Sequence, residues 1–394
     1  MRTPPSLAIL GAGPIGLEAA LAAAERGWRF TVYEAAPAAG GHVRDWGHVR
    51  LFTPWTMAVS DRVRAALGDS APEGAALPTG HELADRVLDP VAALPRIAPR
   101  LRLGNRVLAV VREGLLKHEA IGAVPERSER PFRLLVSGPD GEERVERADA
   151  VLDCTGTYGT PNTLGDGGIP APGEQRHADR IEHRIPDVAA RPRDWAGRTV
   201  LLTGAGHSAQ TAARQFAKLA RDAPETRLLW AVRNSDPTWS AVEDDTLSER
   251  AALTRTSREL AAGASSAVEV LTGRVTESLS DAGGRLTVTL RNGQAEQVVV
   301  DGVLALNGGV GDQSLYRQLQ VHECYATAAP MKLSAALLGA AGGDCLDVPP
   351  LGPETLVNPE PGFFVVGAKS YGRASQFLLR NGWAQVDDVM GLLA

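Results

Sequence analysis

Short apolar runs alternate with alanine-rich amphipathic segments along much of this chain. Leu7–Leu10 and Thr199–Thr203 are apolar runs of strand length, and helix-like stretches follow at 17–26 and 210–220. A strand that is followed by a helix favours a parallel sheet, because the helix carries the chain back to the edge where the next strand begins. The pattern therefore predicts an α/β fold.

A glycine-rich turn stands between the strand and the helix at both places. The small residues of the two turns follow the spacing of a dinucleotide-binding fingerprint, at Gly11, Gly13 and Gly16 in the first turn and at Gly204, Gly206 and Ala209, preceded by Ser208, in the second. Glycines in this context let the backbone approach a pyrophosphate, which the N-terminus of the following helix stabilises. Two such turns in one chain of 394 residues predict two bound dinucleotides.

In each half of the chain, a charged residue ends the second predicted strand, and the sign of its charge differs between the halves. Glu34 lies near the spacing expected for a carboxylate that binds an adenosine ribose, and such a carboxylate repels a 2′-phosphate, so the first site suits FAD or NAD rather than NADP. Arg233 holds the corresponding place in the second half, where its planar guanidinium can pair with a 2′-phosphate. The contrast predicts FAD at the first site and NADPH at the second. An ordinary surface role for either side chain remains the alternative.

The chain also repeats a longer pattern. Hairpins are predicted within 132–148 and 285–300, and each precedes an apolar strand that starts at an Asp and ends in glycine, at 149–156 and 301–308. The repeat predicts two Rossmann-like domains, each with three layers in the order sheet, sheet and helices (ββα).

The order of the repeated elements predicts a discontinuous first domain. Residues 1–165 and 321–394 are assigned to an FAD-binding domain, and 166–320 to an NAD(P)H-binding domain inserted into it. A polar, helix-like insertion is predicted at 236–264.

Composition excludes several other classes of protein. The net charge of −6 argues against a nucleic-acid partner, and no apolar run approaches membrane-spanning length. Three dispersed cysteines form neither a disulfide framework nor a CxxC motif, and His322 beside Cys324 is too small a set for a metal. The sequence predicts a cytoplasmic enzyme without a metal. A homodimer is one option for its assembly.

With these motifs the chain resembles the two-dinucleotide-binding-domain flavoproteins, and within them the flavin-containing monooxygenase-like group. The resemblance rests on the first turn with Glu34 and the pair Gly40-Gly41, on Cys154-Thr155-Gly156, and on the second turn. It implies further contacts to FAD from Val107, Thr155, Gly156, Gly367, Gln376 and Phe377. A helix beginning near 375–376 would point its N-terminal amides at the flavin.

The chain departs from this group at two places. Ala171 and Ile181 occupy the aromatic positions of a fingerprint that Gly173 and His177 otherwise fit. Ala368 stands where many relatives carry an aspartate that binds the ribityl chain. These departures leave the subfamily open.

The resemblance implies an FAD-dependent oxidoreductase that uses NADPH. Our leading interpretation is a monooxygenase that transfers one oxygen atom from O2, through a flavin C4a-peroxide, to nitrogen, sulfur or a carbonyl carbon of a small organic substrate. Arg50, Thr53 and Gln376 are the polar candidates for the flavin face. A reductase or dehydrogenase without oxygen insertion, and a redox-sensing flavoprotein, are the alternatives.

Overall fold

The chain forms two compact units, one inserted into the other. The computed structural model describes residues 6–122, 124–339, 344–348 and 351–394. The first unit comprises Met1–Thr160 and Val310–Ala394, and the second unit comprises Pro161–Gly309. The boundaries predicted from the sequence lie later in the chain, after residues 165 and 320. The dinucleotide that each unit binds stays a prediction.

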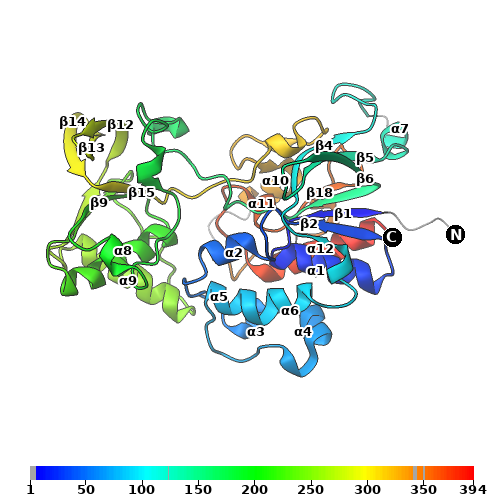
Figure 1. Ribbon diagram of the computed structural model, residues 1–394, viewed down its shortest axis with the longest axis horizontal. Coiled ribbons are helices and arrows are strands. Elements are labelled where there is room, and N and C mark those ends of the chain that lie inside the picture. Colours follow the sequence, from blue (N-terminus) through cyan, green and yellow to red (C-terminus); the bar gives the residue numbers. More distant parts are fainter. Residues whose placement is uncertain (1–5, 123, 340–343, 349–350) are drawn as a thin grey trace. The chain divides into compact units, whose positions relative to one another are not determined.

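A five-stranded parallel sheet forms the centre of the first unit (Figure 1). Its strand order is β18-β7-β1-β2-β3, and all four pairings are parallel. All strands except β3 are almost wholly buried, because other layers cover both faces of the sheet. The bounds are β1 Leu7–Leu10, β2 Phe30–Tyr33, β3 Leu101–Arg102, β7 Ala150–Asp153 and β18 Phe363–Val365.

Side chains along β1 alternate between two hydrophobic clusters. Leu7 and Ile9 belong to the cluster that includes the helices, whereas Ala8 and Leu10 belong to the cluster that includes an antiparallel sheet. Figure 1 shows α1 and α12 on one side of the parallel sheet and β4, β5 and β6 on the other. The bounds are α1 Pro14–Glu25, α12 Leu379–Leu392, β4 Arg106–Arg112, β5 Phe132–Ser137 and β6 Glu143–Ala148. This is the predicted ββα layering.

The remaining elements of the first unit are short and extend from this framework. Helices α2 to α6 lie between β2 and β3 in the chain and contribute buried side chains to the helical cluster. The bounds are α2 Gly41–Asp45, α3 Trp55–Ala58, α4 Asp61–Leu67, α5 Gly80–Leu83, α6 Asp89–Ala92, α7 Val124–Ser128, α10 Met331–Gly339, α11 Ala368–Tyr371, β16 Glu323–Cys324 and β17 Ala329–Pro330.

The second unit repeats the same three layers. Its parallel sheet has the order β11-β10-β9-β15-β8, and an antiparallel sheet of β12, β13 and β14 packs on it through Leu201, Val303, Leu286 and Val288. The bounds are β8 Ile181–Glu182, β9 Thr199–Thr203, β10 Arg227–Val232, β11 Val268–Thr272, β15 Gly302–Ala305, β12 Val275–Ala282, β13 Arg285–Asn292, β14 Gln294–Val300, α8 His207–Asp222 and α9 Ser248–Ala261. The predicted fold class of two Rossmann-like domains is therefore confirmed.

Four helix predictions need correction. The helices after the glycine turns begin at Pro14 and His207, each three residues earlier than the sequence pattern indicated, because the glycine before each serves as the N-cap. The last helix, α12, begins at Leu379 and not near 375–376. The insertion at 236–264 is helical only in α9, and Trp239, Ser240 and Asp244 before it have positive φ angles.

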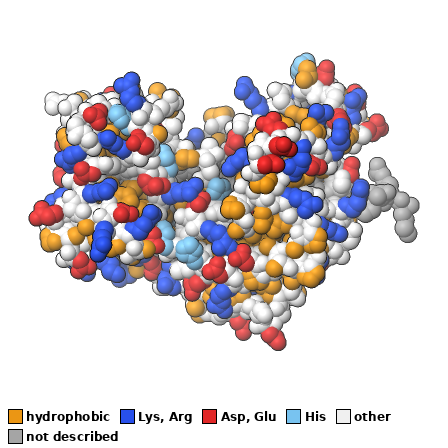
Figure 2. Space-filling view, viewed as in Figure 1, with side chains coloured by type: hydrophobic (Ala, Val, Ile, Leu, Met, Phe, Trp, Pro, Cys, Tyr) orange, Lys and Arg blue, Asp and Glu red, His pale blue; other side chains and the backbone are white. Residues whose placement is uncertain are grey.

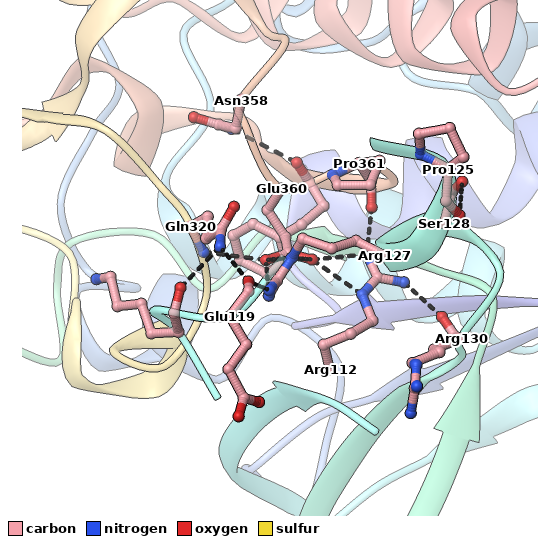
Figure 3. A network of polar contacts seen from close by, with 12 residues as sticks. Arg112, Glu119, Pro125, Arg127, Ser128, Arg130, Gln320, Asn358, Glu360 and Pro361 are labelled. Carbon is pink, nitrogen blue, oxygen red and sulfur yellow. Dashed lines mark hydrogen bonds and ion pairs between the residues drawn. The ribbon is translucent and has the colours of Figure 1, made fainter. Parts of the chain in front are cut away.

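Glu360 is a fully buried carboxylate held between two buried arginines (Figure 3). Its side chain is 0% exposed, and those of Arg112 and Arg127 are each 1% exposed. The closest oxygen–nitrogen distances are 2.8 Å to Arg112 and 2.7 Å to Arg127. The backbone amide of Gln320 donates a further hydrogen bond of 3.0 Å to Glu360. Four segments that are distant in the sequence are therefore joined at one carboxylate.

Backbone carbonyls accept further hydrogen bonds from the two guanidinium groups of this cluster. Arg112 donates to the carbonyl of Arg130 at 2.7 Å, and Arg127 donates to the carbonyl of Glu119 at 2.9 Å. Because every charged group has partners, the cluster can be buried without leaving an uncompensated ion. It fastens the long loop between β4 and β5 to the body of the first unit.

We expect Glu360→Gln to destabilise the protein strongly, because it leaves two buried guanidinium groups without their counter-charge. The expected loss in the free energy of unfolding is about 3–5 kcal/mol, measured by urea titration. Glu146→Gln is the matched control, since Glu146 pairs with Arg144 at the surface and should lose less than about 1 kcal/mol. Equal losses in the two variants would show that the buried cluster has no special role.

Candidate functional site

A cavity of about 360 Å³ opens at the carboxyl edge of the parallel sheet in the first unit. Residues at or just after the ends of β1, β2, β7 and β18 line it, together with the start of β4. Its size lies within the range of small-molecule sites, and the carboxyl edge is where open α/β sheets bind ligands. Ten of the predicted contacts line this cavity, namely Gly11, Gly13, Glu34, Gly40, Gly41, Val107, Thr155, Gly156, Gly367 and Phe377.

The three glycines of the first turn have different physical roles. Gly11 has a φ of 96°, and a Cβ atom on it would lie 2.9 Å from the carbonyl oxygen of Cys154. A Cβ on Gly16 would lie 1.9 Å from the carbonyl oxygen of Gly11, so this glycine allows the helix to start directly against the strand end. Gly13 faces open space, with nothing within 4 Å of its Cβ position. Only Gly13 therefore leaves room for a ligand.

The N-terminus of α1 presents backbone donors at this open space. Gly13 is the N-cap and supplies no side-chain hydrogen bond, and Pro14 occupies the first turn of the helix. The first amides of a helix have no intrahelical partners and attract anions. A phosphate group therefore fits the space in front of Gly13.

The carboxylate of Glu34 braces the turn while it lines the cavity. Its two oxygens accept hydrogen bonds from the backbone amides of Ala12 at 2.7 Å and Ala36 at 2.9 Å. Each carboxylate oxygen has a second lone pair, so the group can still accept from ligand hydroxyls. This arrangement fits the predicted role of Glu34 as the ribose-binding carboxylate.

The paired glycines are required by the packing of the protein itself. A Cβ on Gly40 would lie 2.4 Å from Cδ1 of Leu88, and a Cβ on Gly41 would lie 2.4 Å from Cβ of Ala36. Gly40 also has a φ of 68° and donates to the carbonyl of Ala12 at 2.9 Å. The pair brings the start of α2 close to the glycine turn, where it contributes to the cavity wall.

Several lining residues were not predicted. His42 and Tyr158 both line the cavity, with ring centroids 5.7 Å apart, and Trp46 lies in the same wall. Asn105 and Arg106 also line it, immediately before the predicted contact Val107. For Asn105 and Arg106 the sequence offered one signal, which is their place between Gly104 and Val107 at the start of a strand. That signal does not identify a ligand contact by itself.

The three candidate catalytic residues do not line this cavity. Arg50 is exposed and donates to the carbonyl of Leu77 at 2.7 Å. Thr53 and Gln376 are half-buried in the loops before α3 and α12. Their proposed role at the flavin face stays a prediction.

The second unit has a glycine turn of the same construction. Gly204 has a φ of 110°, and its Cβ would lie 2.2 Å from the carbonyl oxygen of Leu306. Gly206 is the N-cap of α8 and has nothing within 4 Å of its Cβ position, as at Gly13 in the first unit. Ser208 lies in the first turn of the helix, which begins at His207. Both units therefore leave the same middle glycine open.

Other contacts in the second unit fix this turn from behind. Trp230 donates from Nε1 to the carbonyl of Gly204 at 2.7 Å, and Gln210 donates to the carbonyl of Ala205 at 3.0 Å. Arg233 is exposed after the end of β10, and no described residue forms a hydrogen bond or ion pair with it. Its guanidinium is therefore available to an anionic ligand.

Two other features concern metal binding and membrane crossing. Across the described ranges, no group of three or more His, Cys, Asp or Glu is arranged to hold a metal ion. Within the same ranges, no helix combines the length and the apolar character needed to cross a bilayer. Figure 2 shows acidic and basic side chains interspersed over the face that it displays.

Comparison with protein-family models matches residues 9–64 to an NAD(P)-binding Rossmann-like domain. A search of curated proteins finds no match to this chain. Among solved structures, the chain is similar to a bacillithiol disulfide reductase from Bacillus cereus, at 18% identity over 99% of this chain and 98% of that chain, with a TM-score of 0.69.

Two monooxygenase structures are similar over almost the same length. One is the FAD-bound cadaverine monooxygenase of desferrioxamine biosynthesis from Erwinia amylovora, at 12% identity, 98% and 94% coverage and a TM-score of 0.67. The other is an ornithine N-hydroxylase from Kutzneria sp. 744 with reduced FAD, NADP+ and L-ornithine, at 14% identity, 99% coverage of both chains and a TM-score of 0.62. The resemblance to two-dinucleotide flavoproteins is confirmed at the level of the fold.

Gly13→Ala should separate ligand binding from folding. Its methyl group enters open space, so the thermal unfolding midpoint of the ligand-free protein should stay unchanged while the affinity for FAD falls about tenfold, or about 1.4 kcal/mol. Gly16→Ala is the matched comparison and should lower the unfolding midpoint, because its methyl meets the backbone of Gly11. Calorimetry and flavin fluorescence measure the two quantities. Unchanged FAD affinity in Gly13→Ala would remove the turn from the binding site.

Proposed function

We propose that this protein is an FAD-dependent oxidoreductase that takes its electrons from NADPH. The observation that carries the proposal is the repeated turn. In both units an open middle glycine stands at a helix N-terminus, at the carboxyl edge of a parallel sheet. Two dinucleotide sites in one chain are typical of proteins that pass electrons from one cofactor to the other.

FAD is proposed for the first unit. The cavity offers free helix amides to a pyrophosphate and the carboxylate of Glu34 to a ribose. Arg106 adds an exposed positive charge to the same wall. When bound, FAD would supply the chemistry of accepting a hydride and passing the electrons on. The protein residues would hold its phosphates and ribose and keep the ring system in place.

NADPH is proposed for the second unit. Arg233 follows β10, at the place where Glu34 follows β2 in the first unit. The guanidinium has the charge and the donor geometry for a 2′-phosphate, which distinguishes NADPH from NADH.

Oxygen transfer to a small organic substrate is the outcome that we favour, with O2 as the co-substrate. The three cysteines are free and form no CxxC motif, which disfavours the alternative of a reductase that works through a dithiol. Burial raises the pKa of the Cys154 thiol well above its ordinary value, and the nearby carboxylate of Asp153 raises it further. A thiol held in its protonated form is a poor nucleophile for disulfide exchange.

A reductase that does not insert oxygen is the second candidate. The similarity to the bacillithiol disulfide reductase, with a TM-score of 0.69, supports it as strongly as the similarity to the monooxygenases supports oxygen transfer. A redox-sensing flavoprotein is a third proposal and differs from both by the absence of turnover.

Anaerobic mixing with NADPH should bleach the yellow colour of the FAD-loaded protein within the time of a catalytic cycle. Oxygen consumption is then measured with cadaverine and L-ornithine as amine probes, and anaerobic reoxidation with bacillithiol disulfide. Oxygen uptake that forms a hydroxylated amine would establish the monooxygenase, whereas reoxidation by the disulfide would establish the reductase. A protein that NADPH does not bleach would favour sensing, and one that takes up no FAD would refute the proposal.

Arg233→Ala should weaken the binding of NADPH and leave that of NADH nearly unchanged. A charge-assisted contact of about 1.5–3 kcal/mol corresponds to roughly a tenfold to hundredfold increase in the dissociation constant. Arg227→Ala, at the opposite end of β10, is the matched control and should change neither affinity. Equal losses for NADPH and NADH in Arg233→Ala would mean that this residue does not select the cofactor.

A further inference from the structure

A buried ion pair lies directly behind the wall of the first cavity. Lys369 in α11 and Asp153 at the end of β7 are 2.6 Å apart, and their side chains are 2% and 0% exposed. The chain contains only four lysines, and the other three are Lys117, Lys218 and Lys332. Lys369 is the one with a buried ammonium group. Such a group needs compensation, because an unpaired ion in the interior is costly.

Every donor of this ammonium group has a partner. Besides Asp153, Lys369 donates to the hydroxyl of Thr155 at 3.1 Å and to the carbonyl of Asp312 at 2.7 Å. The other carboxylate oxygen of Asp153 accepts from the hydroxyl and the amide of Thr155, at 2.7 and 3.1 Å. Thr155 is therefore held by both members of the pair.

The pair is one residue removed from the cavity on both sides. Cys154 and Thr155 follow Asp153 and line the cavity, and Ala368 precedes Lys369 and lines it too. Both charges act electrostatically on Cys154 in this wall. Burial is the main cause of the raised pKa of Cys154, but Asp153 also raises that pKa and Lys369 lowers it.

The surrounding packing holds the lysine in this one position. A Cβ on Gly311 would lie 2.2 Å from Cγ of Lys369, so the stem of the lysine fills the space that a larger residue would need. The ammonium group also lies 5.1 Å from the ring centroid of Tyr316. Lys369 does not line the cavity, so it is a positioning residue and not a ligand contact.

We propose that the Lys369–Asp153 pair sets the electron affinity of the cofactor in the first unit by keeping the charge behind its cavity wall balanced. This inference rests on the proposed function. A flavin gains negative charge when it is reduced, so an unbalanced charge behind the wall changes the equilibrium between its two redox states. Positive charge favours the reduced state, and negative charge favours the oxidised state.

The test compares variants that leave opposite charges unpaired. Lys369→Met leaves the Asp153 carboxylate and should lower the midpoint potential of bound FAD, whereas Asp153→Asn leaves the Lys369 ammonium and should raise it. We expect each equilibrium constant for reduction to change about tenfold, which is about 30 mV for a two-electron couple. The double variant Lys369→Met/Asp153→Asn should return close to the original potential.

Opposite signs distinguish electrostatics from damage to the fold, because a distorted site would shift both single variants in the same direction. Lys332→Met is the matched control at an exposed lysine and should leave the potential unchanged. Gly311→Ala displaces the lysine stem without changing any charge, so it should lower the affinity for FAD by disturbing Thr155. If one charge variant fails to fold, the sign of the potential shift in the other still tests the inference.

The potentials are measured on the full chain loaded with FAD, by equilibration with a reference dye. Shifts of the same sign in the two single variants, or no shift in either, would overturn the inference while leaving the proposed function intact. An unaltered protein that binds no FAD would instead overturn the proposed function.

Discussion

The close approach of a helix start to a strand end is the constraint on which the rest of this structure depends. At Gly16 the space available is so small that a Cβ atom would lie 1.9 Å from the carbonyl oxygen of Gly11. Because the two backbones meet there, α1 begins directly beyond the end of β1, and Gly13, Pro14 and Ile15 at its start line the cavity. In the second unit Gly204 makes the close approach that Gly11 makes in the first, since its Cβ would lie 2.2 Å from the carbonyl oxygen of Leu306, whereas Ala209 holds the place of Gly16. This geometry is typical of turns that bind phosphate, and it supports the proposed dinucleotide sites.

Buried charge holds the irregular segments around that framework. Parallel strands and helices satisfy their own backbone groups, but the loops that return to the first unit cannot. The carboxylate of Glu360 and the ammonium of Lys369 provide fixed partners for those loops. Glu360 contacts three other segments, at Arg112, Arg127 and Gln320, and Lys369 contacts two, at 153–155 and at Asp312. Such clusters tolerate little change, since removal of one partner leaves a buried ion that the interior cannot solvate.

The chemistry that the first site can perform follows from what its wall contains. Backbone donors, one carboxylate held by two amides and aromatic rings are suited to binding and orienting a cofactor, and the raised pKa of Cys154 disfavours its thiolate. This lining supports the proposal that the protein's own groups orient a cofactor and exclude water. The bound cofactor would then carry the electrons. The outcome of the reaction depends on the substrate that reaches this wall.

The sequence by itself determined the two glycine turns, the strands around them and the carboxylate at Glu34, because these features depend on local spacing and on the periodicity of apolar residues. It also indicated ten of the residues that line the cavity. The proposed role of Arg50, Thr53 and Gln376 stays a prediction, because these residues lie in loops outside the cavity lining. Only the tertiary structure could bring Lys369 beside Asp153, 216 residues earlier, or place His42 next to Tyr158 in one wall. Contacts of this kind have no signature in local sequence, since they arise only when the sheet brings the ends of strands that are far apart in the sequence to the same edge.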